Sequence, residues 1–159
     1  MERCMTRTQS WRVGSRLLAV ALALWVAPPG WASLGEPAAS VTADQQALRG
    51  ELLSSAGAGY EVHQIKAADG SIVREYVSPS GVVFGIGWQG PTNPSLELLL
   101  GAHFKEFQAA AQAARRYRRP LAVHTDGLVV EVGGHMRAFH GRAYVPQLLP
   151  DAATAAVVR

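Results

Sequence analysis

The spacing of hydrophobic positions changes along the chain and divides it into strands and helices. Short stretches with apolar, β-branched or aromatic residues at alternate positions are typical of strands. They predict three strands in the first half of the chain, over 60–67, 71–77 and 82–88, and three in the second half, over 121–124, 128–132 and 136–144. Turn residues lie between them, including Asp69-Gly70, Pro79 with Gly81, and Gly133-Gly134.

Two stretches have apolar residues at intervals of three and four, which is typical of helices. The first runs from about Ala43 to Ala56, with Leu48 and Leu52 on one face and a capping box that begins at Thr42. The second runs from Pro94 to Arg118 and follows Asn93, which can cap it. Gly101 is a weak point of this long helix, where a kink or a break is expected if the helix is interrupted at all.

The resulting order, α-β-β-β-α-β-β-β, predicts an α+β domain. We expect an antiparallel-rich sheet of five or six strands with the long helix packed on one face. On the strand 82–88, Val82, Phe84, Ile86 and Trp88 are expected on one face. Val83, Gly85 and Gly87 are expected on the other, where the glycines predict close contact with a helix. The order of elements would fit a duplicated αβββ unit, and Val62-His63 in the first half resembles Val123-His124 in the second. The sequence leaves this duplication open.

The N-terminal composition predicts a secretory signal peptide over 1–32. Arginines precede an eleven-residue apolar run, Leu17 to Ala27, which is shorter than the roughly 20 residues of a membrane-spanning helix. Gly30 and Ala32 provide the small residues of a cleavage site, so we expect cleavage after Ala32 and export by the general secretory route. The rest divides into a flexible leader over 33–41, a single domain over 42–150 and a tail over 151–159.

Removal of the signal peptide changes the charge. The chain has 15 Lys and Arg and 12 Asp and Glu, and the first 32 residues hold four arginines and one glutamate, which leaves 11 of each sign. A neutral mature chain gives no argument for nucleic-acid binding. Cys4 leaves with the signal peptide, so the domain must build its core without disulfides. No membrane span is expected after processing.

Two stretches carry a resemblance to a known family. EYVSPSGVVFGIGWQGPTNPSLELLL (Glu75–Leu100) and GHMRAFHGRAYVPQLLP (Gly134–Pro150) resemble the secreted bacterial proteins catalogued as domain of unknown function 2844. The resemblance spans most of residues 33–150. It implies export and the extent of the domain, and it implies no activity.

Most chemical motifs in the sequence are weak. Gly85-Ile-Gly87-Trp-Gln-Gly90 has the spacing of a dinucleotide loop, but Pro91 and Pro94 delay the helix whose N-terminus would bind the pyrophosphate. There is no G-x-S-x-G motif and no cysteine after Cys4. We therefore assign no catalytic residue and expect no cofactor. The histidines offer one trio for a metal ion, His63, His124 and Glu131.

One region gathers aromatic and guanidinium groups away from any helix end. The strand 136–144 alternates basic and aromatic residues, and a loop entrance precedes Gly90, so we expect a binding surface made of Trp88, Gln89, Arg137, His140, Arg142 and Tyr144. Two functions stay open. One is a secreted or periplasmic, non-catalytic binding module for an envelope protein, peptide or polymer; the other is a small periplasmic hydrolase or metal-dependent enzyme that uses the histidine trio. The sequence leaves the oligomeric state open.

Overall fold

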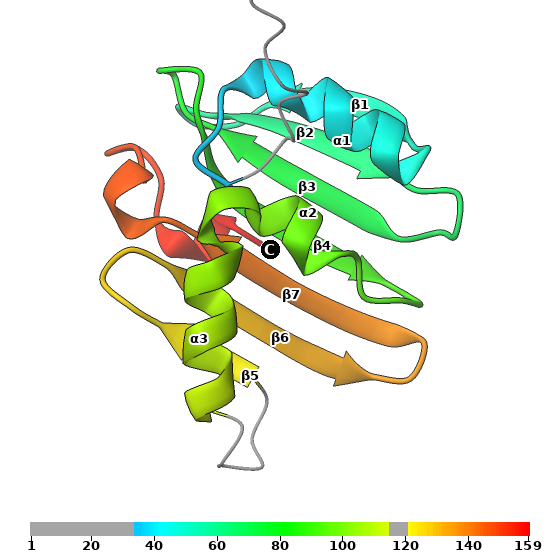
Figure 1. Cartoon of the computed structure of the whole chain (residues 1–159). Coiled ribbons are helices and arrows are strands. Elements are labelled where there is room, and N and C mark those ends of the chain that lie inside the picture. Colours follow the sequence, from blue (N-terminus) through cyan, green and yellow to red (C-terminus); the bar gives the residue numbers. More distant parts are fainter. Residues whose placement is uncertain (1–33, 115–120) are drawn as a thin grey trace, which may run out of the picture.

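The computed structural model describes residues 34–114 and 121–159. These residues form one seven-stranded antiparallel sheet with the order β1-β2-β3-β4-β7-β6-β5 and helices on one of its faces (Figure 1). The strands are β1 (Glu51–Ala56), β2 (Glu61–Lys66), β3 (Ile72–Val77), β4 (Val83–Gly90), β5 (Leu121–His124), β6 (Val129–His135) and β7 (Ala138–Tyr144). The helices are α1 (Val41–Leu48), α2 (Leu96–Leu100) and α3 (Phe104–Ala114). The predicted α+β class is confirmed, and the predicted count of five or six strands is too low.

The additional strand is β1, which lies where the sequence predicts the second half of a helix. Helix α1 ends at Leu48 because Arg49 adopts a left-handed conformation with φ 49°. Gly50 then allows a close approach to β2, since a Cβ on it would lie 2.6 Å from Cγ2 of Ile65. The following residues pair antiparallel with β2 over Glu51–Ala56. The four-residue spacing of two leucines suits a helix, but strand pairing decides the local structure here.

The predicted long helix is broken, so the expectation of one helix is wrong. Gly101, with φ 47° and ψ −118°, ends α2, and a 3-10 turn over Gly101–His103 leads into α3. Ser95 caps α2 by accepting a hydrogen bond from the amide of Leu98, in place of the predicted cap at Asn93. The predicted end at Arg118 lies outside the described residues.

The helices bury their apolar stripe against the sheet, as predicted. Leu99 is fully buried and Phe107 nearly so, and Phe104 packs against the same core. On the sheet side this core contains Val73, Ile86 and Trp88. We call this face of the sheet the helix side.

The opposite face is covered by the last residues of the chain, and we call it the tail side. The tail passes through 3-10 turns at Pro146–Leu148 and Ala155–Val157 and packs Ala153 and Val158 against Tyr76 and Phe84. The glycines of β4 lie beneath it: a Cβ on Gly85 would lie 2.6 Å from Cγ2 of Val158, and one on Gly87 would lie 2.6 Å from the carbonyl oxygen of Arg159. The glycines of β4 therefore do mark a close contact, but with the tail and not with the predicted helix.

An irregularity in β4 explains a further difference from the predicted faces. The register between β3 and β4 shifts at Tyr76 and Val77, so Phe84 leaves the face of Ile86 and joins the tail side. Val83 takes its place in the core of the helix side. A bulge of this kind cannot be read from a simple alternation.

The predicted leader and tail both belong to the folded domain. Leu34 is 1% exposed, and Pro37 forms an isolated antiparallel bridge with Val82. The tail is held by Tyr76, whose hydroxyl donates a 2.8 Å hydrogen bond to the carbonyl oxygen of Arg159. The predicted signal peptide lies outside the described residues. No helix in the part of the chain that the structure describes is long and apolar enough to cross a membrane.

The order of elements differs from two αβββ units. Four strands, not three, follow α1, and β4 stands in the middle of the sheet between β1–β2–β3 and β7–β6–β5. His63 lies on the second strand of its meander, whereas His124 lies on the first strand of the other. The two histidines that suggest a repeat therefore do not occupy equivalent places.

Candidate functional site

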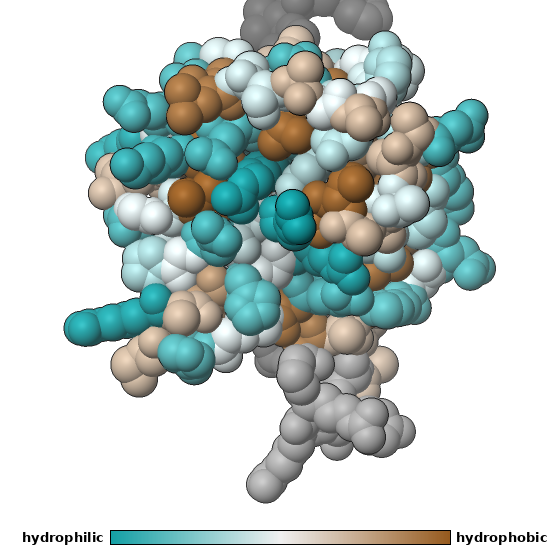
Figure 2. All heavy atoms as spheres, turned by 180° about the vertical axis from the view of Figure 1, so that it is seen from behind, coloured by the Kyte–Doolittle hydropathy of each residue, from teal (hydrophilic) through white to brown (hydrophobic). Residues whose placement is uncertain are grey.

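A cavity of about 600 Å³ opens on the tail side, over the strands β4, β7, β6 and β5. Its polar lining comes from Gln89, Glu131, His140, Arg142 and Arg159. Strand register brings these residues together: Gln89 lies opposite His140, and Glu131 lies opposite Arg142. Figure 2, which views the molecule from behind, shows a surface where hydrophilic side chains alternate with small hydrophobic patches.

Arg142 is the central residue of the cavity wall. Its Nε donates a 2.8 Å hydrogen bond to Oε2 of Glu131, and its Nη1 donates a 3.1 Å bond to the carbonyl oxygen of Ala155 in the tail. Its guanidinium lies 5.8 Å from the centre of the Tyr144 ring. The other carboxylate oxygen of Glu131 is 3.2 Å from Nε2 of His124. Arg142 thus joins β7, β6 and the tail, and it is held in place before any ligand arrives.

This pairing shifts the ionisation of both partners. The hydrogen bond from Arg142, together with the charges of Arg142 and His124, lowers the pKa of Glu131 below its usual range. The same hydrogen bond raises the pKa of Arg142. The cavity therefore contains a charged pair at neutral pH, with Gln89 and the exposed ring of His140 beside it.

The structure brings together only part of the expected binding surface. Gln89, His140 and Arg142 line the cavity, and Tyr144 supports Arg142 from the tail-side core. The Trp88 side chain is 2% exposed and belongs to the core of the helix side. Arg137 lies at the exposed tip of the β6–β7 turn, in a left-handed conformation with φ 67°, and does not line the cavity.

The expected metal trio is not assembled. His124 and Glu131 are partners, but His63 lies on β2, and four strands stand between β2 and β5. His63 is opposite Glu75, whose side chain is buried in the helix-side half of the domain, whereas Glu131 lines the tail-side cavity. Within residues 34–114 and 121–159, no group of three His, Cys, Asp or Glu side chains could hold a metal ion.

His63 instead belongs to a short polar chain on the β1–β2 hairpin. Its Nδ1 is 2.8 Å from Oγ of Ser54, and its Nε2 is 3.5 Å from Oε1 of Glu61. The order serine, histidine, acid is that of a catalytic triad. However, the separation of His63 and Glu61 is long for a hydrogen bond that must orient the imidazole, and Ser54 is exposed on the edge strand β1.

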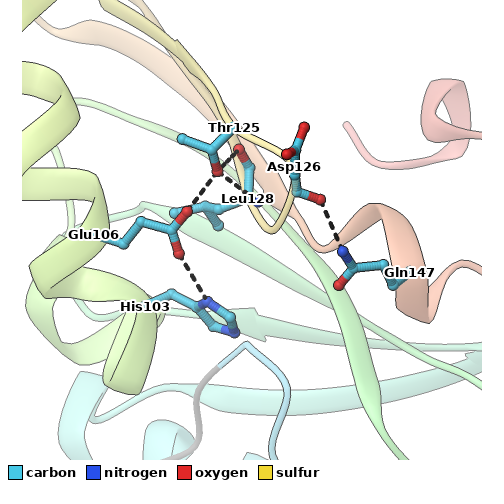
Figure 3. Close-up of polar contacts among 6 residues, drawn as sticks. All are labelled: His103, Glu106, Thr125, Asp126, Leu128 and Gln147. Carbon is cyan, nitrogen blue, oxygen red and sulfur yellow. Dashed lines mark hydrogen bonds and ion pairs between the residues drawn. The ribbon is translucent and has the colours of Figure 1, made fainter.

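A second polar chain links α3 to the β5–β6 turn (Figure 3). The hydroxyl of Thr125 donates to Oε1 of Glu106 at 2.5 Å and accepts from the amide of Leu128 at 2.9 Å. The other oxygen of Glu106 is 3.8 Å from Nδ1 of His103. Because the carboxylate lies between the imidazole and the hydroxyl, the histidine cannot take a proton from Thr125. The arrangement positions a turn and does not activate a nucleophile.

Sequence reasoning missed the residues that extend the site toward β2 and β3. A second hollow of about 460 Å³ shares Gln89 and Arg159 with the first and is also lined by Arg74 and Tyr76. The signal was available, because these two residues alternate with Val73 and Val77 along one strand. What could not be read from the sequence was that the tail would cross this face.

Comparison with known proteins supports the family resemblance. No curated protein and no solved structure gives a significant match. The family model described as a protein of unknown function (DUF2844) matches residues 30–158. The match covers nearly the whole chain, so the protein belongs to the DUF2844 family.

Proposed function

We propose that this protein is a secreted or periplasmic binding module without catalytic activity, and that the tail-side cavity receives its ligand. The observation that supports this proposal is the convergence of Gln89, His140 and Arg142 on one cavity. A preformed hollow with an apolar lining and a few polar groups is the usual form of a ligand site. The signal-like N-terminal sequence supports the compartment.

The chemistry of the lining favours an anionic group on an apolar body. Two arginines and one histidine face one glutamate in the cavity, and Glu131 is already bonded to Arg142. The exposed side chains of Ala122 and Ala156 add apolar surface. Arginine binds carboxylates and phosphates through several donors at once. We therefore propose a segment of an envelope protein, peptide or polymer that carries a carboxylate or phosphate beside apolar groups.

Two matched fluorescent probes test this proposal. Anilinonaphthalene sulfonate carries an anion on an aromatic body, and N-phenylnaphthylamine is the same body without the sulfonate. We expect the sulfonate probe to bind the folded protein more tightly than the neutral probe, with a difference that shrinks as salt is added.

A substitution locates the binding. Ala122→Trp should fill the cavity from β5 and abolish binding of the sulfonate probe, because Ala122 is exposed and lines the cavity without taking part in the charged pair. Ser55→Trp, on the exposed strand β1, is the matched control and should bind like the wild type. Equal binding by both variants, with circular dichroism showing both folded, would refute the proposed site.

A further inference from the structure

Two carboxyl groups are buried beneath helix α1, away from the tail-side cavity. Asp44 of α1 is 0% exposed and Glu75 of β3 is 1% exposed. None of their four carboxyl oxygens has a hydrogen-bond partner among the described residues. Burying an ionised carboxylate without a compensating partner is very costly, so such a pair favours its protonated form.

The two groups lie in the contact between a helix and the sheet. Val41 and Asp44 are the buried residues of α1, and Leu48 packs against the same core. Figure 1 shows α1 lying over the part of the sheet that contains β2 and β3. Glu75 lies between its register partners His63 on β2 and Ile86 on β4. The pair therefore joins α1 to the middle of the sheet.

No cation among the described residues compensates the pair. Asp44 is the only ionisable residue of α1, and β4 contains none. On β2, His63 is held by Ser54 and lies beside Glu61. The basic side chains nearest in sequence point elsewhere: Arg49 and Lys66 are exposed, and Arg74 bonds Gln64 on the tail side.

We propose that Asp44 and Glu75 form a proton-operated latch, which holds α1 against the sheet while the pair is protonated and releases α1 as the pH rises. Release uncovers Glu75 beside His63 and Ser54, a polar row that α1 otherwise helps to cover.

The ionisation of the pair supports the latch. Burial raises the pKa of Asp44 to about 9, and the negative charge of the neighbouring Glu75 acts in the same direction. Burial raises the pKa of Glu75 to about 7. A carboxyl whose pKa is higher in the closed state loses its proton on opening whenever the pH lies between the open and the closed values. The pair therefore stabilises the closed state most at acidic pH. This stabilisation decreases as the pH rises above 3.8 and 4.5, the ordinary pKa values of the two carboxyls, and it is lost above about pH 9.

Hydrogen exchange of the α1 amides in the full-length protein tests the latch. After correction for intrinsic exchange, the exchange rates give the equilibrium constant for the opening of α1. Because opening releases one proton between pH 7 and 9, this constant should increase about tenfold per pH unit in that range and level off above pH 9. Helix α3, which contains no part of the pair, should show no such rise. A flat profile for α1, or an equal rise in α1 and α3, would overturn the proposal.

Substitution of the pair separates the latch from general alkaline loosening. In Asp44→Asn combined with Glu75→Gln the opening of α1 should become independent of pH, whereas Glu97→Gln, at an exposed position on α2, should keep the wild-type profile. A double variant that retains the wild-type slope would overturn the latch. If the double variant does not fold, a carbon-13 titration of the wild-type carboxyls decides: two carboxyls that titrate above pH 6 support the latch, and ordinary titration of both near pH 4 excludes it.

Discussion

Substitution of Gly87 by alanine should dislodge the tail from the sheet. Gly87 lies on β4, and its φ is outside the left-handed region, so alanine causes no backbone strain there. The added Cβ would lie 2.6 Å from the carbonyl oxygen and 2.7 Å from the carbonyl carbon of Arg159. Because these are backbone atoms, no side-chain rotation relieves the overlap, and the tail must move.

The cost depends on how much of the tail leaves. The hydroxyl of Tyr76 donates to the Arg159 carbonyl at 2.8 Å and accepts from the Arg159 amide at 3.2 Å. Loss of both bonds costs about 2 kcal/mol in the free energy of unfolding, at about 1 kcal/mol each. Val158 is 0% exposed; if it also leaves its site, exposure of this side chain adds about 2 kcal/mol. We expect a loss between about 2 and about 4 kcal/mol.

Urea unfolding followed by the fluorescence of Trp88, the only tryptophan after residue 32, measures this loss. Gly127→Ala is the matched control, because a Cβ there meets only the Glu106 carboxylate at 3.7 Å, an ordinary contact. The control should be unchanged or stabilised by about 0.4–1 kcal/mol through the lower entropy of its unfolded chain. If Gly87→Ala is as stable as Gly127→Ala, the glycines of β4 do not serve to seat the tail.

Two further substitutions examine the polar contacts that hold the tail side and the β5–β6 turn. Arg142→Ala should lower the free energy of unfolding by about 1–2 kcal/mol at pH 7, a figure that allows for the partial exposure of the ion pair. Because the pKa of Glu131 is lowered in the folded state, this loss should shrink as the pH falls below 4.5, the ordinary pKa of a glutamate. Urea unfolding at several pH values measures both effects. Thr125→Val should lower the free energy of unfolding by about 1–2 kcal/mol and speed amide exchange at Leu128, since the amide of Leu128 and the carboxylate of Glu106 both lose their partner. Thr125→Ser should retain the exchange rate of the wild type. Equal effects of the two substitutions would contradict the role of the hydroxyl.

Local signals were sufficient for most strands. The strand predicted over 121–124 has the observed bounds. The strand predicted over 60–67 is one residue longer than β2 at each end, and the one over 71–77 begins one residue before β3. Asp69-Gly70 explains this accuracy, because Gly70 takes φ 86° and Asp69 accepts the Ser71 amide at 2.8 Å, so the turn is specified by its own residues. Where the residues of a turn specify its conformation, the bounds of the neighbouring strands can be predicted from the sequence.

Elements decided by distant contacts were missed. Leu48 and Leu52 have helical spacing, yet Leu52 belongs to a strand, because β1 gains a full set of hydrogen bonds from β2. The tail has no pattern of its own, and its place is set by the glycines of β4, such as Gly87, which meets Arg159, 72 residues later in the sequence. Neither contact can be found from the residues of the segment alone.

The residues of the two candidate sites also differ in how clearly the local sequence points to them. His140 and Arg142 were predicted as binding residues because a histidine or an arginine on a short strand is conspicuous, and Gln89 because it stands at a loop entrance; the register of β4 and β7 brings them to one cavity. Asp44 and Glu75 were missed because each is a single carboxylate in an otherwise ordinary element. A signal existed: Val73, Glu75 and Val77 alternate on one face of β3, and an acid among buried valines needs an explanation.

Strand β3 separates the two sites physically. Its residues point alternately to the two faces, so Glu75 lies beneath α1 while Arg74 and Tyr76 reach the tail side. β3 is paired along its whole length with β2 and β4, which prevents it from following either α1 or the tail. Opening of the latch therefore leaves the register of the sheet unchanged, and with it the alignment of Gln89 and His140 that forms the cavity. The proposed latch could therefore expose Glu75 beside His63 on the helix side while the cavity proposed as the binding site on the tail side stays intact.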